Sequence, residues 1–192
     1  MSPATGVERM ASRISLDRRV GGRPLREALL GDLIWRRPSV FSRELILEAG
    51  SEELAALRWE KWFSFDAIAE SADGLWTIGR RRSASLFGDY VVRDPASGDE
   101  VAGFKRSWRG TGVVRFASGA EYPWNREGFW HPRHFWAAED GRPLISFRSV
   151  LGFGRSYEMD VDPPARSLAE LPVLVLLGGY VMALISARRK AS

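Results

Sequence analysis

Apolar and polar residues alternate in short runs along most of the chain. In one such run Trp76 and Ile78 share a side with Arg80, while Leu75 and Thr77 face the other way, a period typical of half-buried β-strands. Turn signals separate these runs at Ala49-Gly50, Asp73-Gly74, Ser97-Gly98, Ser118-Gly119 and Asp140-Gly141, whose glycines lie 24, 24, 21 and 22 residues apart. Each interval holds two strand-like runs, so the pattern predicts an antiparallel meander of hairpins with one wet and one dry face.

The pattern predicts about twelve strands and a short helical turn at residues 24–30 before them. The predicted strands are Leu33–Arg37, Glu44–Glu48, Leu54–Trp59, Asp66–Glu70, Leu75–Arg80, Tyr90–Asp94, Val101–Arg106, Val113–Ala117, Tyr122–Asn125, Phe135–Ala138, Leu144–Phe147 and Tyr157–Val161. Such a meander either folds into a sandwich or closes into a barrel, and closure removes exposed strand edges. Because side chains alone fill barrels of roughly eight strands, a larger one needs something inside it.

The segment predicted to fill that barrel is an almost uncharged apolar run, Leu171–Ala187. At 17 residues it measures roughly 25 Å as a helix, shorter than the ~30 Å hydrocarbon core of a bilayer. A cytosolic body anchored by this run would also have to push Arg188, Arg189 and Lys190 across the membrane, against the positive-inside tendency. We therefore expect a mainly β protein, a closed antiparallel barrel of about twelve strands wrapped around a hydrophobic C-terminal helix. The alternative is a tail-anchored membrane protein with a cytosolic β domain that spans the bilayer by residues 171–187.

The central helix is expected at about residues 167–188. Ser167 and Glu170 have the Ser-x-x-Glu spacing of a capping box, whereas Pro172 lies deeper than the ideal first helical position and either kinks the helix or marks a later start. Residues 1–22 are polar, Arg-rich and without periodicity, and we expect a flexible basic tail there. Residues 23–192 show no break in composition, which predicts a single domain.

Several segments together resemble the tubby-like barrel superfamily, which includes tubby C-terminal domains, phospholipid scramblases and LURP-one-related proteins. The segments that carry the resemblance are Leu45-Ile46-Leu47-Glu48, Leu57-Arg58-Trp59, Gly74-Leu75-Trp76-Thr77-Ile78, Glu100-Val101-Ala102-Gly103-Phe104, Gly119-Ala120-Glu121-Tyr122-Pro123-Trp124 and the terminal helix. The resemblance covers residues 33–190 and implies that the final helix runs through the barrel. Tubby domains are associated with phosphoinositide binding, but no basic motif of this chain matches theirs residue by residue, and a chain without cysteine offers no site for scramblase-like palmitoylation.

Composition narrows the function without naming it. The net charge is +4, carried by 25 Arg and three Lys, which is too mild to identify a partner. The absence of cysteine excludes disulfides, thiolate metal sites and thiol nucleophiles. Residues 1–20 lack the apolar stretch of a secretory signal, so we expect the body in the cytoplasm, either free or peripheral at the inner face of the membrane.

The candidate ligand-binding or lipid-binding residues are basic and aromatic residues at predicted hairpin ends: Arg80, Arg81, Arg82, Arg106, Trp108 and Arg109. Together with Arg126, Arg133 and Arg142 these arginines form a basic rim if the hairpin ends meet in space, and a rim of this kind attracts phosphate headgroups. Trp108 between basic residues is typical of a stacking platform or of a membrane-interface anchor. Solvated arginines and strand-end packing of the tryptophan are the plainer interpretation.

The sequence holds no constellation that identifies a reaction. His131 and His134 are too few for a metal site, and we interpret their aromatic segment, residues 129–136, as a loop that plugs one barrel end. Neither a Ser-His-acid set nor a phosphate-binding loop is evident. We therefore predict a non-enzymatic protein without cofactor or metal, with anionic phospholipid or a membrane surface as its partner and no specific nucleic acid.

Overall fold

The structure, a computed structural model, describes residue 20 and residues 22–39, 42–59, 65–81, 89–107, 110–130, 132–150 and 156–189. A short helix, twelve strands, a 3-10 turn and a long C-terminal helix follow one another along the chain. Their bounds are α2 Leu25–Ala28, β1 Leu33–Arg36, β2 Glu44–Ala49, β3 Glu52–Trp59, β4 Ala67–Ser71, β5 Gly74–Arg80, β6 Asp89–Arg93, β7 Glu100–Arg106, β8 Gly112–Phe116, β9 Glu121–Glu127, β10 Arg133–Ala137, β11 Pro143–Ser149, β12 Tyr157–Val161, η1 Pro163–Ser167 and α3 Leu171–Arg189. Both ends of each predicted strand lie within two residues of the ends of the corresponding observed strand.

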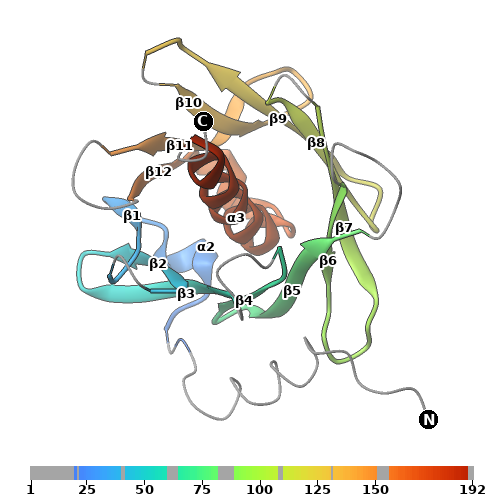
Figure 1. Cartoon of the computed structure of the whole chain (residues 1–192), viewed down its shortest axis with the longest axis horizontal. Helices are drawn as coiled ribbons and strands as arrows, with labels where there is room; N and C mark the ends of the chain where they lie inside the picture. Colours follow the sequence, from blue (N-terminus) through green and yellow to red (C-terminus); the bar gives the residue numbers. More distant parts are fainter. Residues whose placement is uncertain are drawn as a thin grey trace.

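The twelve strands form a closed antiparallel barrel in which every strand pairs with its neighbours in sequence (Figure 1). The first and last strands close it, with Leu33 opposite Met159 and Trp35 opposite Tyr157. Closure leaves no free edge in the sheet, which removes the templates on which edge strands aggregate. The predicted fold class is therefore confirmed.

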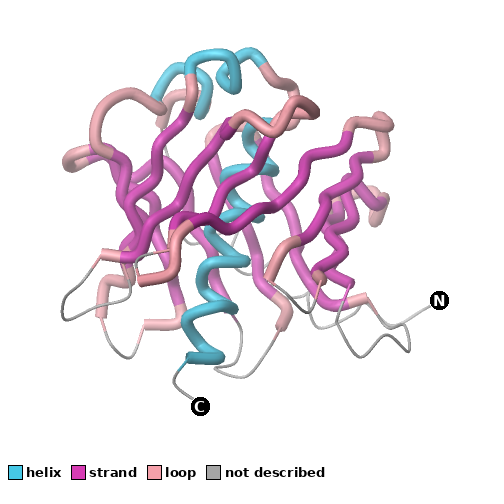
Figure 2. The backbone as a smooth tube through the Cα atoms, turned by 90° about the horizontal axis from the view of Figure 1, so that it is seen from above, coloured by secondary structure: helices cyan, strands magenta, loops and turns pink. Residues whose placement is uncertain are grey.

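The two ends of the barrel differ in their connections. At one end, the turn end, tight turns join β2–β3, β4–β5, β6–β7, β8–β9 and β10–β11, and Gly98 and Gly119 take φ values of +78° and +91° that favour glycine. The other strand ends, where β1, β3, β5, β7, β9 and β11 finish and the next strand of each pair begins, lie at the opposite end, the loop end, where α3 also finishes (Figure 2). The glycines predicted from spacing thus all belong to one end of the barrel.

Helix α3 fills the barrel. It runs through the middle of the ring of strands (Figure 1). Its residues from Leu171 to Ala183 are all buried, so it presents apolar side chains to the sheet on every side. Among the described residues, no helix has both the length and the apolar character needed to cross a bilayer. The structure places residues 171–183 of this segment inside the barrel, whereas the tail-anchored alternative requires them to lie in a bilayer.

Two glycines let the wall of the barrel approach the helix backbone. A Cβ atom on Gly178 would lie 2.1 Å from the ring of Phe147, and one on Gly179 would lie 2.7 Å from the indole of Trp35. Both rings are fully buried, so they have little room to move aside. Small residues at these positions are therefore a packing requirement of the filled barrel.

Hydrogen bonds hold α3 along its length. At the turn end, Ser118 and Tyr122 lie within hydrogen-bond distance of the carboxylate of Glu170, at 3.1 and 3.3 Å. Further along, Trp136 donates from Nε1 to the Leu174 carbonyl at 2.8 Å. At the loop end, the hydroxyls of Tyr157 and Ser186 lie 2.8 Å apart. The helix is thus fixed in direction, from the turn end to the loop end.

The predicted capping box is wrong. Ser167 ends the 3-10 turn, and its hydroxyl donates to the Pro164 carbonyl, while Glu170 accepts from the β8–β9 region instead. The helix begins later, at Leu171, so Pro172 lies in the first turn, where its missing N–H leaves no bond unmade. Glu170 therefore bonds to residues distant in sequence, Ser118 and Tyr122, and does not form the predicted capping box with Ser167.

The outer face of β2, β3 and β4 carries a partly buried ion-pair cluster. Arg58 contacts Glu44 at 2.7 Å and Glu70 at 2.5 Å, and the amide of Val20 donates to Glu70 at 3.1 Å. Val20 is buried, so the end of the predicted flexible tail packs on the barrel. Residues 1–19 and 21 lie outside the described residues.

The filled barrel makes a prediction for Gly178→Ala. Alanine favours helix over glycine by roughly 1 kcal/mol, so local propensity alone predicts stabilisation. Because the new methyl group collides with Phe147, we expect a loss of about 1–3 kcal/mol in unfolding free energy, measured by chemical denaturation. Ala187→Leu, at an exposed position of the same helix, is the control and should change stability by less than about 0.5 kcal/mol. A stabilised Gly178→Ala variant would contradict the observed packing.

The Tyr122–Glu170 contact should make a contribution to the free energy of unfolding that depends on pH. Burial, followed by the nearby Glu170 carboxylate, raises the pKa of Tyr122 to about 12. An unfolded tyrosine ionises near ~10, so the folded state holds the proton more tightly between these values, and stability falls as pH rises from about 10 to about 12. Tyr122→Phe should cost about 1 kcal/mol at neutral pH, from the lost hydrogen bond, and this difference from wild type should shrink over that alkaline window. Denaturant titrations at several pH values measure it, and a pH-independent difference would contradict the assignment.

Candidate functional site

Three of the predicted site residues meet at one corner of the loop end. Arg80 ends β5, Arg81 follows it, and Arg106 ends β7, with β6 between these two strands. The register aligns Arg80 on β5 with Tyr90 on β6 and aligns Asp89 on β6 with Lys105 on β7, so Arg80 and Lys105 lie two strands apart at the same end of the barrel. Arg82, Trp108 and Arg109 lie outside the described residues, and their part in the site stays a prediction.

Strand alternation divides these cations between two surfaces. Arg80 and Arg106 follow the inward-facing Ile78 and Phe104 by two residues, so they lie on the rim of the barrel mouth. The guanidinium of Arg80 lies over the ring of Phe65, 5.6 Å from its centre. Arg81 and Lys105 belong to the outer face, and both side chains are exposed. The corner therefore presents positive charge in two directions, along the barrel axis at the loop end and outward from the barrel wall.

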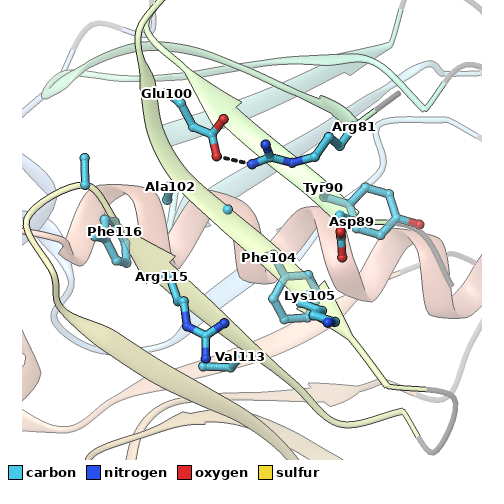
Figure 3. Close-up of a pocket in the computed structure, with 12 residues that line it drawn as sticks. Arg81, Asp89, Tyr90, Glu100, Ala102, Phe104, Lys105, Val113, Arg115 and Phe116 are labelled. Atoms are coloured by element: carbon cyan, nitrogen blue, oxygen red, sulfur yellow. Dashed lines mark hydrogen bonds and ion pairs between the residues drawn. The ribbon is translucent and has the colours of Figure 1, made fainter. Parts of the chain in front are cut away.

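A hollow of about 570 Å³ opens on the outer face of β6, β7 and β8 (Figure 3). Gly103 forms its floor, where a Cβ atom would lie 3.2 Å from Glu100 Oε1 and 3.4 Å from Arg81 Nη2. Arg81 pairs with Glu100 on one side, and Arg115 lies on the other. Lys105 and Asp89 line its loop-end margin. The hollow exists because a glycine interrupts the row of outward side chains on β7.

The chemistry of the hollow suits ion pairing. Its charged lining consists of three cations, Arg81, Lys105 and Arg115, and two carboxylates, Asp89 and Glu100. Arg115 is also paired with Glu121 at 2.6 Å, so part of the positive charge is already compensated. Among the described residues that line it, there is no serine, histidine or other nucleophile and base pair. The hollow is a surface for contacts between charges, with a modest positive excess.

The charges of the described residues separate between the two ends of the barrel. Connections at the turn end carry mostly acidic side chains: Asp32, Asp73, Asp94, Asp99, Glu139 and Asp140. Strand ends at the loop end carry mostly basic ones: Arg80, Arg81, Lys105, Arg106, Arg126, Arg133 and Arg148. The backbone of α3 also ends at the loop end, at Arg189. The barrel is thus electrostatically polarised along its axis, with the loop end attracting anions.

One residue of the predicted basic rim is at the wrong end. Arg142 lies in the β10–β11 turn, at the turn end, where it contacts Asp162 at 2.9 Å and Asp140 at 3.8 Å. An antiparallel meander sends alternate connections to opposite ends, and β10–β11 falls on the acidic one. Arg126 and Arg133, by contrast, do lie at the loop end.

The aromatic segment at residues 129–136 does not plug the barrel. Phe129 and Trp130 are 80% and 85% exposed in the β9–β10 connection, with their rings edge to face at 5.4 Å. Phe135 points outward, beneath the guanidinium of Arg133, whereas Trp136 reaches the helix. The buried core contains α3 together with Trp124 and Trp136, and Phe129 and Trp130 lie outside it.

The described histidine of this segment has a packing role. His134 is buried and stacks on Trp124, with ring centres 5.7 Å apart. Among the described residues, no group of three or more histidine or carboxylate side chains gathers as metal ligands do. His131 lies outside the described residues.

Sequence reasoning missed three residues of this surface. Lys105 belongs to the basic and aromatic segment Lys105-Arg106-Ser107-Trp108-Arg109, but it was left out of the predicted site residues. Phe129 and Trp130 were assigned to the interior because aromatic residues are usually buried. A useful signal was present, since the strand alternation resumes only at Arg133, after Gly128 and Pro132, which marks the two rings as part of a connection.

Comparisons with protein-family models, with curated proteins and with solved structures give no match for this chain. The class of protein is therefore defined by its own architecture, a closed twelve-stranded antiparallel barrel built around its C-terminal helix.

Proposed function

We propose that this protein is a non-enzymatic barrel that binds anionic lipid surfaces through its loop end. The observation that carries the proposal is the gathering of Arg80, Arg81, Lys105 and Arg106 at one corner, from strands distant in sequence. Arg80, Arg81 and Lys105 are exposed, whereas Nε and Nη1 of Arg106 are buried. Exposed cations that lie close together attract the phosphates and carboxylates of lipid headgroups.

The polarised charge of the barrel supports the same proposal. A protein that approaches an anionic surface turns its basic end toward it, and the acidic turn end is repelled. The proposal also keeps the tubby-like resemblance, since a closed barrel around an apolar terminal helix is the architecture that the resemblance implies. In this proposal the protein works in the cytoplasm and meets the inner face of the membrane.

The expected affinity is modest. Each basic residue near an anionic membrane contributes about 1 kcal/mol, so the three exposed ones, Arg80, Arg81 and Lys105, give at most about 3 kcal/mol, which corresponds to a dissociation constant of about 6 mM. Arg81 is partly neutralised by Glu100, which lowers the contribution further. Binding by charge alone is therefore weak, reversible and sensitive to salt.

Flotation of the full chain with lipid vesicles tests the proposal. We expect recovery with vesicles of phosphatidylcholine and phosphatidylserine at low salt, little recovery with phosphatidylcholine alone, and loss of binding as salt rises. Lys105→Glu should weaken partition about 30-fold, because it changes the charge by two at about 1 kcal/mol each.

The matched control is Arg26→Glu on α2, which makes the same change of charge on an exposed residue at the turn end. It should leave partition within about twofold of wild type, since it is turned away from the surface. Equal recovery with neutral and acidic vesicles, or equal losses in the two variants, would reject the proposed surface.

A further inference from the structure

Two large aromatic side chains stand out from the loop end without any role in the fold. The described large hydrophobic residues with appreciable exposure are Leu30 at 57%, Phe65 at 43%, Phe129 at 80%, Trp130 at 85% and Val150 at 38%. Four of these five lie at the loop end, and the two most exposed are consecutive. Single exposed apolar residues are ordinary, but a pair of rings in contact forms an apolar tip whose exposure to water is costly.

The tip is held firmly by the hairpin beneath it. Strands β9 and β10 pair up to Glu127 opposite Arg133, and these two side chains form an ion pair at 2.8 Å. Gly128, with a φ of +85°, then turns the chain into the aromatic pair. The edge-to-face contact of Phe129 and Trp130, with an interplanar angle of 87°, packs the rings against each other. The rings are thus presented outward by an ordered ladder.

The surroundings of the tip are basic. Arg126 is exposed beside it on β9, and Arg148 is exposed on β11, opposite Arg133 on one side and Glu158 of β12 on the other. Arg126 is therefore the cation of this group that has no carboxylate directly opposite it in the ladders. The nearest acidic side chain of the hairpin, Glu127, is already paired with Arg133. Apolar rings surrounded by cations match the boundary of an anionic bilayer, where rings lie at headgroup depth and cations meet lipid phosphates.

The tip also supplies an apolar contribution to membrane binding, which the basic corner lacks. Stable attachment to a membrane takes two contributions, and the charges of the proposed function provide only one, which salt screens. The corner at β5–β7 and the tip at β9–β10 come from different parts of the barrel wall but from the same end. Because α3 finishes at this same end of the barrel, contact at both places would point the helix axis toward the membrane (Figure 2).

We propose that Phe129 and Trp130 insert into the headgroup region of an anionic bilayer and so hold the barrel with its loop end facing the bilayer. This inference rests on the proposed function and adds the inserting element and the orientation to it. Insertion is the salt-resistant part of binding, while the basic corner is the salt-sensitive part.

The absence of cysteine gives a direct test, because Phe129→Cys and Leu30→Cys each accept a single environment-sensitive fluorophore. With vesicles of phosphatidylcholine and phosphatidylserine, the label at position 129 should shift to the blue and be quenched by brominated acyl chains. The label at position 30, on the opposite end of the barrel, should do neither.

A pair of variants measures the contribution to binding. Phe129→Ser combined with Trp130→Ser should lower partition by about tenfold or more and abolish the fraction that survives high salt, because partial burial of two rings is lost. Leu30→Ser, an exposed apolar residue at the turn end, is the control and should bind as wild type. Both sets of changes lie on the surface, so folding should be unaffected.

The outcomes separate the two proposals. If anionic vesicles still bind the protein and Lys105→Glu still weakens binding, but the tip label and the serine variants show no effect, the inserting tip is rejected and the proposed function stands. If wild type does not bind vesicles at all, both are rejected. A shift of the label at position 129 that appears without vesicles and grows with protein concentration would mean that the tip contacts a second copy of the chain, which also overturns the inference.

Discussion

The structure depends on the filling of its own barrel by α3. Twelve strands enclose more space than their inward side chains can occupy, and an empty interior of that size would forfeit the dispersion contacts on which a core relies. The helix supplies Leu and Val side chains on all sides, and Gly178 and Gly179 let Phe147 and Trp35 rest against its backbone. A segment with the composition of a membrane anchor thus becomes the core of a barrel.

The direction of α3 and the meander of the strands together make the two ends unlike. The helix enters beside Glu170 at the turn end and finishes beside Tyr157 at the loop end. Tight turns with acidic residues close the first end, and the described strand ends at the second carry mostly basic residues. Phe129 and Trp130 are exposed in the β9–β10 connection at this second end.

Local patterns were good guides wherever one short-range requirement decided the structure. Alternation located the strands because each has one buried face, and the spaced glycines located the turns because a tight hairpin needs a backbone that most residues avoid. The patterns failed where a distant partner competed. Glu170 bonds to Ser118 and Tyr122 rather than capping the helix with Ser167, and Arg142 follows its turn to the acidic end rather than joining the other arginines.

The sequence by itself determined the twelve strands, the five turns and the apolar helix, since these follow from periodicity and from residues with narrow conformational preferences. Tertiary structure decided the rest. Pairing of β1 with β12 closed the barrel around α3. Antiparallel pairing of β5, β6 and β7 brought Arg80, Arg81, Lys105 and Arg106 to one corner, because alternate connections of a meander share an end, and it left Phe129 and Trp130 exposed in the β9–β10 connection at that same end.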